Sequence, residues 1–295
     1  MSVGGQADSA HEYLLKQYLL TAKSDRASLK MCQSRLRHHL SRDILTSTAD
    51  IQATTRILTN LFYVSPTRHL LYVTDTLKNG RTPTHTLEHL SCFLPGLLAL
   101  GAHTLPLDNL ASMGINLDDL AKDLNAEFKA DYARLGLYNL KDIHLWAAEG
   151  LAQTCFLTYA DQQSHLGPEE VVMYYTPDHK KPYERVVGSL WFETLESWRK
   201  SGSRGLPPGL AQKAPVIYDK QEGLKGLLKG KPSRDYVIRK TEYLLRPEVS
   251  IVITRFHFYK LTIWFLSDTR VVVYIVASDW GLSMARVWLG NFRSH

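Results

Sequence analysis

Residues 2–20 read SVGGQADSAHEYLLKQYLL, and this stretch predicts a helix that begins just after a tight turn. Ser9 and Glu12 have the spacing of a capping box, in which each side chain binds a free backbone N–H of the first helical turn. Apolar side chains then recur at helical spacing, at Tyr13, Leu14, Tyr18 and Leu19. Asp8 lies just before this helix, where free N–H groups favour an ionised carboxylate. It can therefore serve as a cap or as a charged group of an active site.

Most of the remaining chain has the same helical character. Apolar periodicity predicts further helices over Ile51–Phe62, Leu87–Leu100, Asp142–Tyr159 and Val186–Arg199. Gly, Ser and Pro predict loops over Asn79–Pro83 and Ser201–Pro208, and the basic stretch Lys220–Arg234 is expected to be a solvated insertion. Strand signals are few before residue 248, so the sequence predicts an all-α protein.

Composition excludes several classes of protein. With 295 residues, 44% of them hydrophobic and 22% charged, the chain is typical of a globular protein. The net charge of +6 is spread along the sequence, so no nucleic-acid partner is expected. The N-terminus does not resemble a signal peptide, and charges interrupt the apolar stretch Phe256–Val276 that could otherwise span a membrane.

Two short motifs allow more than one interpretation. HTLEH at residues 85–89 fits the H-x-x-E-H pattern of zinc peptidases, in which two histidines on one helical face bind the metal and Glu88 acts as the base. Without an evident third ligand, a polar helix start is the simpler interpretation. Arg246-Pro247-Glu248 is a common way to begin a helix, with proline in its first turn.

Taken together, four segments resemble the class I α-1,2-mannosidases of glycoside hydrolase family 47. Residues 2–20 resemble the family's S-x-GG-x-ADS-x-x-EYLLK segment, and EHLSCFLPGLLALGA at residues 88–102 resembles HL-x-CF-x-x-G-x-LALGA. GLAQTCFLTYADQQSHLGPE at residues 150–169 resembles L-x-x-TC-x-x-TY followed by GL-x-PE, and EYLLRPE at residues 242–248 resembles the start of YLLRPETVES. The order of the segments is also the order found in the family.

This resemblance implies a fold, an activity and a set of site residues. The family folds as an (αα)7 barrel and hydrolyses α-1,2-mannosides with inversion, using calcium. Asp8 corresponds to the carboxylate on the acid side of the reaction and Glu248 to the general base. Arg246 and His89 correspond to residues in or near the sugar pocket. Inversion needs such a pair of carboxylates, one that protonates the leaving oxygen and one that activates water.

The resemblance also implies a disulfide, a substrate and a compartment. Cys92 and Cys155 correspond to the family's disulfide pair, which would leave Cys32 free. The expected partners are high-mannose N-glycans on glycoproteins in the secretory pathway, in the endoplasmic reticulum or the Golgi. The parent enzyme is expected to be anchored in the membrane by a segment outside this chain.

Some family elements have no counterpart in the sequence. A further catalytic glutamate, the SF-x-x-ET segment and the threonine that binds calcium are not found, so we expect a partial barrel without its metal ligand that does not catalyse hydrolysis. The alternative function is non-catalytic glycan binding in glycoprotein quality control.

The tail has a different character from the rest. Residues 249–295 are rich in Val, Ile, Thr, Phe and Tyr, which breaks the helical pattern of residues 1–248. The codons of Val249-Ser250 permit a 5′ splice site and those of Ser267-Asp268 permit a 3′ site. Beyond the second site, we read the codons in a frame shifted by one base. In that frame they permit the amino-acid sequence that follows RPE in the family. We therefore expect residues 249–295 to be a translated intron followed by an out-of-frame exon, without a native fold.

Overall fold

The computed structural model of the chain describes residues 3, 53–78, 80–113, 115–122, 124–177, 183–210, 214–217, 234–242 and 244. This part is rich in helices and also contains two small antiparallel sheets of three strands each. The expected all-α chain is therefore too simple a description. The (αα)7 barrel remains a prediction.

The described elements follow a helix over residues 53–60. In order they are β1 (Phe62–Val64), β2 (Leu71–Val73), β3 (Thr86–Glu88), the 3-10 helix η1 (His89–Phe93), α4 (Leu94–Thr104), the 3-10 helix η2 (Leu110–Met113), α5 (Leu117–Ala121), α6 (Ala126–Leu135), α7 (Leu140–Ala160), β4 (Glu170–Met173), β5 (Ser189–Leu190), α8 (Trp191–Lys200) and β6 (Tyr236–Lys240).

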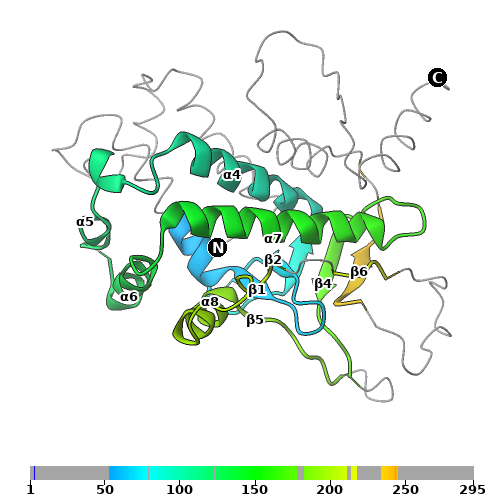
Figure 1. Cartoon of the computed structure of the whole chain (residues 1–295). Helices are drawn as coiled ribbons and strands as arrows, with labels where there is room; N and C mark the ends of the chain where they lie inside the picture. The colour runs from blue at the N-terminus through cyan, green and yellow to red at the C-terminus, as the bar shows by residue number, and fades with distance from the viewer. Residues whose placement is uncertain are drawn as a thin grey trace, which may run out of the picture.

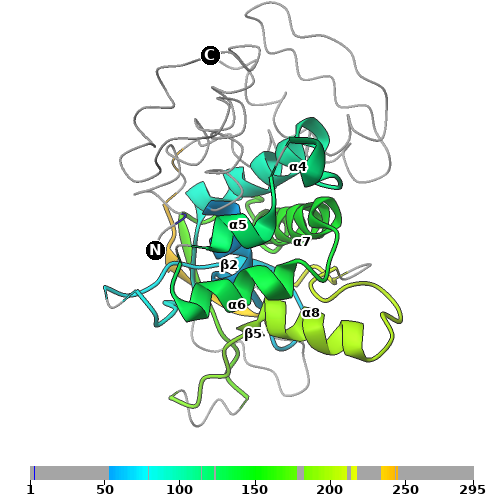
Figure 2. The same ribbon diagram turned by 90° about the vertical axis from the view of Figure 1, so that its left-hand side faces the viewer.

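The long helix α7 organises this part of the molecule. The side chain of Asn139 caps it by accepting hydrogen bonds from the backbone N–H groups of Lys141 and Asp142, at 2.9 and 3.3 Å. Helix α4 lies along α7 in both views (Figures 1 and 2). The two helices are antiparallel, because Cys92 before α4 is bonded to Cys155 near the end of α7. The helix predicted over Asp142–Tyr159 is thus confirmed.

Small residues on α7 allow the backbone of the strands to approach. A Cβ atom on Gly150 would lie 2.7 Å from the carbonyl oxygen of Gly209 and 2.9 Å from the side chain of Leu71. Leu71 belongs to β2, which is buried throughout. Glycine at position 150 therefore sets the distance between α7 and the first sheet.

The first sheet has the strand order β2-β1-β5, and α8 follows directly after β5. Phe62 of β1 packs against Trp191 of α8 with ring centroids 5.7 Å apart. Helix α8 lies beside α6, and the guanidinium of Arg134 donates to Glu196 at 2.7 Å (Figure 2). The second sheet has the order β3-β4-β6 and lies near the C-terminal end of α7 (Figure 1).

Two predicted helices begin later than expected. In the range Leu87–Leu100, the chain first forms β3 and η1, and the α-helix starts at Leu94 and runs to Thr104. In the range Val186–Arg199, α8 starts at Trp191. Both errors arise because a strand of two or three residues is shorter than the window that reveals a period of two. The predicted loop over Ser201–Pro208 is confirmed.

Several expectations concern other parts of the chain. The helix after Asp8, the insertion within Lys220–Arg234 up to residue 233, and the tail 249–295 lie outside the described residues. Among the residues that are described, no helix combines the length and the apolar character of a membrane span.

Candidate functional site

His89 stands where the second sheet meets the helical pair. Strand β3 ends at Glu88 and η1 begins at His89. The backbone N–H of His89 donates to the carbonyl oxygen of Glu169 at 2.9 Å. The histidine is 5% exposed. The HL-x-CF segment and the L-x-PE segment, which are far apart in the sequence, thus meet at this residue.

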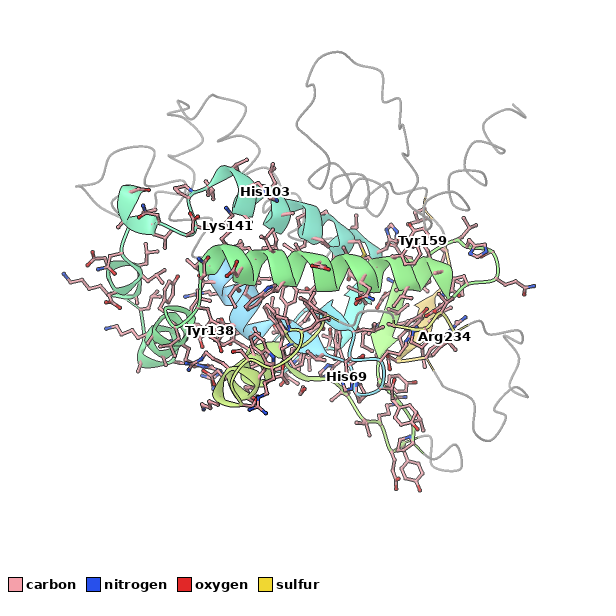
Figure 3. All side chains as sticks on the ribbon, in the orientation of Figure 1. His69, His103, Tyr138, Lys141, Tyr159 and Arg234 are labelled. Atoms are coloured by element: carbon pink, nitrogen blue, oxygen red, sulfur yellow. A yellow bond between two sulfur atoms is a disulfide. The ribbon has the colours of Figure 1, made fainter. Side chains whose placement is uncertain are left out.

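The imidazole of His89 contacts the last turn of α7. Its Nε2 atom forms a short hydrogen bond with the hydroxyl of Tyr159, and the two ring centroids are 5.5 Å apart. The other face of Tyr159 is covered by Gly167, where a Cβ atom would lie 2.4 Å from the tyrosine ring. Tyr159, at the C-terminal end of α7 (Figure 3), is therefore held between the histidine and a position that only glycine can occupy.

A disulfide joins the same two elements. Cys92 of η1 is bonded to Cys155 of α7, with Cα atoms 6.0 Å apart. Both sulfur-bearing residues are buried, at 1% and 0% exposure. The pairing that the resemblance implied for Cys92 and Cys155 is thus present, and it links the second motif segment to the third.

Charged side chains lie in a row across the neighbouring strands. Glu88, Glu170 and Lys240 are register partners on β3, β4 and β6. The carboxylate of Glu170 is 5% exposed and accepts one contact from Arg239 and one from Lys240, both at 2.7 Å. Its hydrogen bond and its charge raise the pKa of Lys240. Both oxygens of this carboxylate are therefore engaged by cations of the protein itself.

The other predicted site residues, Asp8, Arg246 and Glu248, lie outside the described residues. The structure does not test their roles. It also provides no calcium site by itself, because no group of three or more His, Cys, Asp or Glu side chains within the described ranges could hold a metal ion. Glu170, a buried carboxylate on the strand that pairs with β3, is already paired with two cations.

The zinc-peptidase interpretation of residues 85–89 fails on local geometry. Residues Thr86–Glu88 form a strand, so His85 and His89 do not share the face of a helix as that motif requires. His85 has φ of 53° and its Nδ1 lies 2.8 Å from the hydroxyl of Tyr72. His85 and His89 thus each bind a different tyrosine.

A second polar group, which sequence reasoning missed, lies below the same end of α7. The guanidinium of Arg68 binds Asp161 at 2.9 Å and Asp235 at 3.1 Å, and the three side chains are at most 4% exposed. Burial alone would lower the pKa of Arg68, but its hydrogen bonds and charge contacts with Asp161 and Asp235 outweigh this effect and raise it. We call Arg68, Asp161, Asp235, Arg234 and Tyr236 the Arg68 cluster.

Further hydrogen bonds complete the Arg68 cluster. Tyr236 donates to Asp161 at 3.0 Å, the backbone N–H of Ile217 donates to Asp161 at 2.8 Å, and Arg234 donates to the carbonyl oxygen of Ile217 at 3.1 Å. Arg68 is separated from Asp161 by 93 positions and from Asp235 by 167. Nothing in a single sequence distinguishes such an arginine from one on the surface, so no local signal could have found it.

A cavity of about 430 Å³ lies elsewhere, between the first sheet and α8. Its lining is mostly apolar and comprises Val64, Ser65, Pro66, His69, Val187, Ser189, Thr194, Pro208 and Gly209. His69 and Tyr159 lie on different sides of α7 (Figure 3). The cavity is therefore a different place from the junction at His89.

Comparisons with known proteins agree with the motif segments. The family model described as glycosyl hydrolase family 47 matches residues 1–263. A human mannosyl-oligosaccharide 1,2-alpha-mannosidase IC is 28% identical over 169 residues, which are 57% of this chain and 19% of the relative. A mannosyl-oligosaccharide alpha-1,2-mannosidase IA of Spodoptera frugiperda is 37% identical over 134 residues, which are 45% of this chain and 16% of the relative.

A third relative extends the aligned region. The rat endoplasmic reticulum mannosyl-oligosaccharide 1,2-alpha-mannosidase is 29% identical over 203 residues, which are 66% of this chain and 22% of the relative. In these three comparisons the aligned region spans only 16–22% of the curated relative.

Proposed function

The chain belongs to glycosyl hydrolase family 47, and on that premise we propose that it serves α-1,2-mannosidase chemistry at the end of α7 marked by His89. The observation that carries this proposal is the junction itself. The disulfide between Cys92 and Cys155 and the contact between His89 and Tyr159 bring two family segments, residues 88–102 and 150–169, to one place. A site that positions a sugar needs such a rigid support.

The reaction proposed for the parent enzyme is hydrolysis of a terminal α-1,2-linked mannose with inversion. By family membership, Asp8 serves on the acid side and Glu248 is the base that activates water. Arg246 and His89 hold the sugar. In an inverting site the acid protonates the leaving oxygen while the base removes a proton from water on the opposite face of the ring.

The described residues contribute binding and orientation to this proposal. His89 offers an imidazole that is fixed by Tyr159 and by the backbone bond to Glu169. Arg239 and Lys240 balance the buried negative charge of Glu170 on the neighbouring strand. We therefore assign these groups a supporting role beside the sugar, and the acid and base roles to other residues.

Calcium is part of the proposal only because the family uses it. A hard cation of this type binds carboxylate, carbonyl and sugar hydroxyl oxygens, and it would help to orient the terminal mannose. Within the described ranges no group of three or more His, Cys, Asp or Glu side chains could hold the ion.

The proposed substrates are high-mannose N-glycans on glycoproteins in the secretory pathway. The disulfide suits an oxidising compartment such as the endoplasmic reticulum or the Golgi. Membrane anchoring of the parent enzyme is part of the same proposal. The relatives named above are mannosyl-oligosaccharide mannosidases, and they support the mannosidase part of the proposal over their aligned regions only.

The test uses the full chain with two disaccharides, α-1,2-mannobiose and, as a control, α-1,6-mannobiose. Calorimetry should show binding of the α-1,2-linked sugar and weaker binding of the control. A mannose-release assay with and without a calcium chelator tests the reaction. We expect binding without turnover, and release of mannose would overturn the expected inactivity.

Failure of the chain to bind either disaccharide would contradict the proposed function as a whole. Equal binding of both sugars, with no turnover in calcium, would instead favour a glycan-binding role without linkage specificity.

A further inference from the structure

We propose that the chain associates with a second copy of itself, and that Tyr183 of each copy enters the cavity of the other. The cavity is the one of about 430 Å³ between the first sheet and α8. The proposed function is independent of this inference, because neither Tyr183 nor the cavity belongs to the junction at His89. Both parts of the proposed surface lie on or beside one short stretch of chain, residues 183–189.

Tyr183 has the most exposed side chain among the large hydrophobic residues of the described ranges, at 75%. Val186 and Val187 of the same stretch are each 43% exposed. Apolar side chains that are exposed next to one another mark interaction sites, whereas single ones do not. Tyrosine is also enriched at protein interfaces, because its ring is apolar and its hydroxyl can form a hydrogen bond.

The chain that carries Tyr183 is held in place at its base. The backbone N–H of Val186 donates to the carbonyl oxygen of Tyr175 at 2.8 Å, and the N–H of Tyr175 donates back at 2.9 Å. The guanidinium carbon of Arg185 lies 4.5 Å from the centroid of the Tyr174 ring. The described part of this connection between β4 and β5 extends away from α4 and α7 in both views (Figures 1 and 2). Such preorganisation reduces the entropy that is lost when a partner binds.

The cavity begins where this stretch of chain meets the first sheet. A Cβ atom on Gly188 would lie 2.6 Å from the carbonyl oxygen of Val64, so the backbone packs closely against β1 here. Val187 and Ser189, on either side of this glycine, line the cavity. Tyr183 precedes Val187 by four positions, a distance of at most about 14 Å along an extended chain. The exposed tyrosine and the cavity are therefore close neighbours on one surface.

The lining of the cavity suits a tyrosine side chain. Its walls are mostly apolar, and Ser65, Ser189 and Thr194 add hydroxyl groups. The volume of about 430 Å³ lies within the range of sites that take small ligands, ~300–1,000 Å³, so it has room for one aromatic ring. A buried tyrosine needs apolar contacts for its ring and a hydrogen-bond partner for its hydroxyl. Because Tyr183 is exposed in its own chain, it is available to the cavity of another copy.

A two-fold axis would satisfy both contacts at once. In a two-fold dimer the same patch lies on both sides, so each tyrosine meets the cavity of the other copy. Residues 183–189 carry one acidic and one basic side chain, Glu184 and Arg185, so two copies of this stretch do not repel each other. Two tyrosines and two cavity linings would bury on the order of 800 Å². Stable interfaces bury at least ~1,200 Å², so we expect a weak and reversible dimer.

The experiment measures the dimer dissociation constant of the full chain by sedimentation velocity, from about 1 to 500 μM, the range of weak complexes. Tyr183→Ser removes the inserted ring and should raise the constant at least tenfold. Tyr183→Phe loses only a hydrogen bond and should raise it about two- to tenfold. Val187→Glu places a charge that stays hydrated in one copy but is buried on association, so it should also raise the constant at least tenfold.

Leu137→Glu is the matched control for Val187→Glu. Leu137 lies between α6 and α7, is 56% exposed and does not line the cavity. Its replacement should leave the dimer dissociation constant unchanged. Thermal unfolding at the lowest concentration should be the same for all variants, because the replaced side chains are exposed in the single copy.

Mixing two variants tests the insertion itself. Tyr183→Ser keeps an intact cavity and Val187→Glu keeps an intact tyrosine, so a mixed dimer regains one of the two contacts. The mixture should therefore associate more strongly than either variant alone, as measured by energy transfer between dyes on the two proteins.

Each outcome decides for or against the proposal. A chain that stays monomeric over the whole concentration range overturns it, as does a mixture that associates no better than its components. Association that continues beyond the dimer would overturn the two-fold arrangement. A monomeric chain in which Tyr183→Ser weakens binding of α-1,2-mannobiose would assign Tyr183 to the glycan instead.

Discussion

Two polar groups lie at the C-terminal end of α7, and they are built differently. In the Arg68 cluster, the charges of Arg68, Asp161 and Asp235 satisfy one another inside the protein. At the junction, a hydrogen bond joins His89 to Tyr159, next to a disulfide. Both groups connect segments that are distant in the sequence.

The difference indicates what each group can do. A buried carboxylate that is held by an arginine, a tyrosine and a backbone N–H has no capacity left for a ligand. Its role is to hold the end of α7 against residues 214–217 and β6. The imidazole of His89 is bonded to Tyr159, and a disulfide close by fixes its position. The first group therefore supports the scaffold and the second is the candidate for sugar binding.

The largest expected effect comes from opening the Arg68 cluster. Replacing Arg68 by methionine removes the cation and leaves Asp161 and Asp235 buried without it, which should lower the free energy of unfolding by about 3–5 kcal/mol. Urea denaturation measures this change.

Arg239→Met is the matched control for this comparison. Its side chain is 60% exposed, and Lys240 still binds Glu170 in its absence. The loss should stay below about 1 kcal/mol. Similar losses of unfolding free energy for the two arginines would show that the Arg68 cluster stabilises the fold no more than the exposed ion pair of Arg239 does.

Removing the disulfide should have the next largest effect. The bond closes a segment with a sequence separation of 63, and replacing Cys92 and Cys155 together by alanine should cost about 2–4 kcal/mol of unfolding free energy. The variant should also weaken mannobiose binding, because η1 carries His89. Loss of stability with unchanged mannobiose binding would show that the disulfide does not position His89 for the sugar.

His144, in the first half of α7, sharpens the comparison with His89. Burial lowers the pKa of His144 from 6.5 to about 4, partly offset by its hydrogen bond to the carbonyl oxygen of Leu140. The unfolded chain then binds a proton below pH 6.5 that the folded chain does not bind until about pH 4. Stability due to the neutral ring is full above pH 6.5 and falls by about 2–3 kcal/mol as the pH drops to 4.

The measurement compares thermal unfolding of the chain and of His144→Asn between pH 7 and pH 4. Asparagine can still donate to the carbonyl oxygen of Leu140 but does not titrate. The pH slope should be smaller in the variant. Parallel slopes for the two proteins would exclude His144 as a source of acid sensitivity.

The smallest expected effect is a gain of stability in the turn after α7. His165 stands where the family segment GL-x-PE has glycine, and its φ is 55°, in the left-handed region that favours glycine. His165→Gly should relieve this strain and raise the unfolding free energy by about 0.5–1 kcal/mol. His165→Ala keeps the Cβ atom and should give no gain, so equal gains in both variants would point to the lost imidazole instead.

Helix α7 could be predicted from the sequence, and the disulfide from the family resemblance, whereas α5, α6, the sheets and the charge clusters were not predicted. Helix α7 is long enough for its period to be clear, and its Asn139 cap is local. The strands have two to five residues each, too short to show an alternation. Their partners are set by tertiary packing, as when Glu170 of β4 pairs with Lys240 of β6.

The candidate site, too, could be predicted from the sequence only in part. The resemblance named His89, Cys92 and Cys155, and the structure joins the two cysteines directly. The partner of His89 could not be read from the sequence, because the bond to Tyr159 depends on how η1 packs against α7 and on the space left by Gly167. The roles of Asp8, Arg246 and Glu248 remain predictions.

The most direct test of the central claim is to locate a bound sugar with three histidines as probes. ¹⁵N spectra of histidine-labelled chain are recorded during a titration with α-1,2-mannobiose. His89 reports on the junction, His144 on the first half of α7 and His69 on the separate cavity of about 430 Å³. We predict that the signals of His89 move and saturate while those of His144 and His69 stay in place. A saturable change at His69 with none at His89 would contradict the assignment of the sugar site to the end of α7.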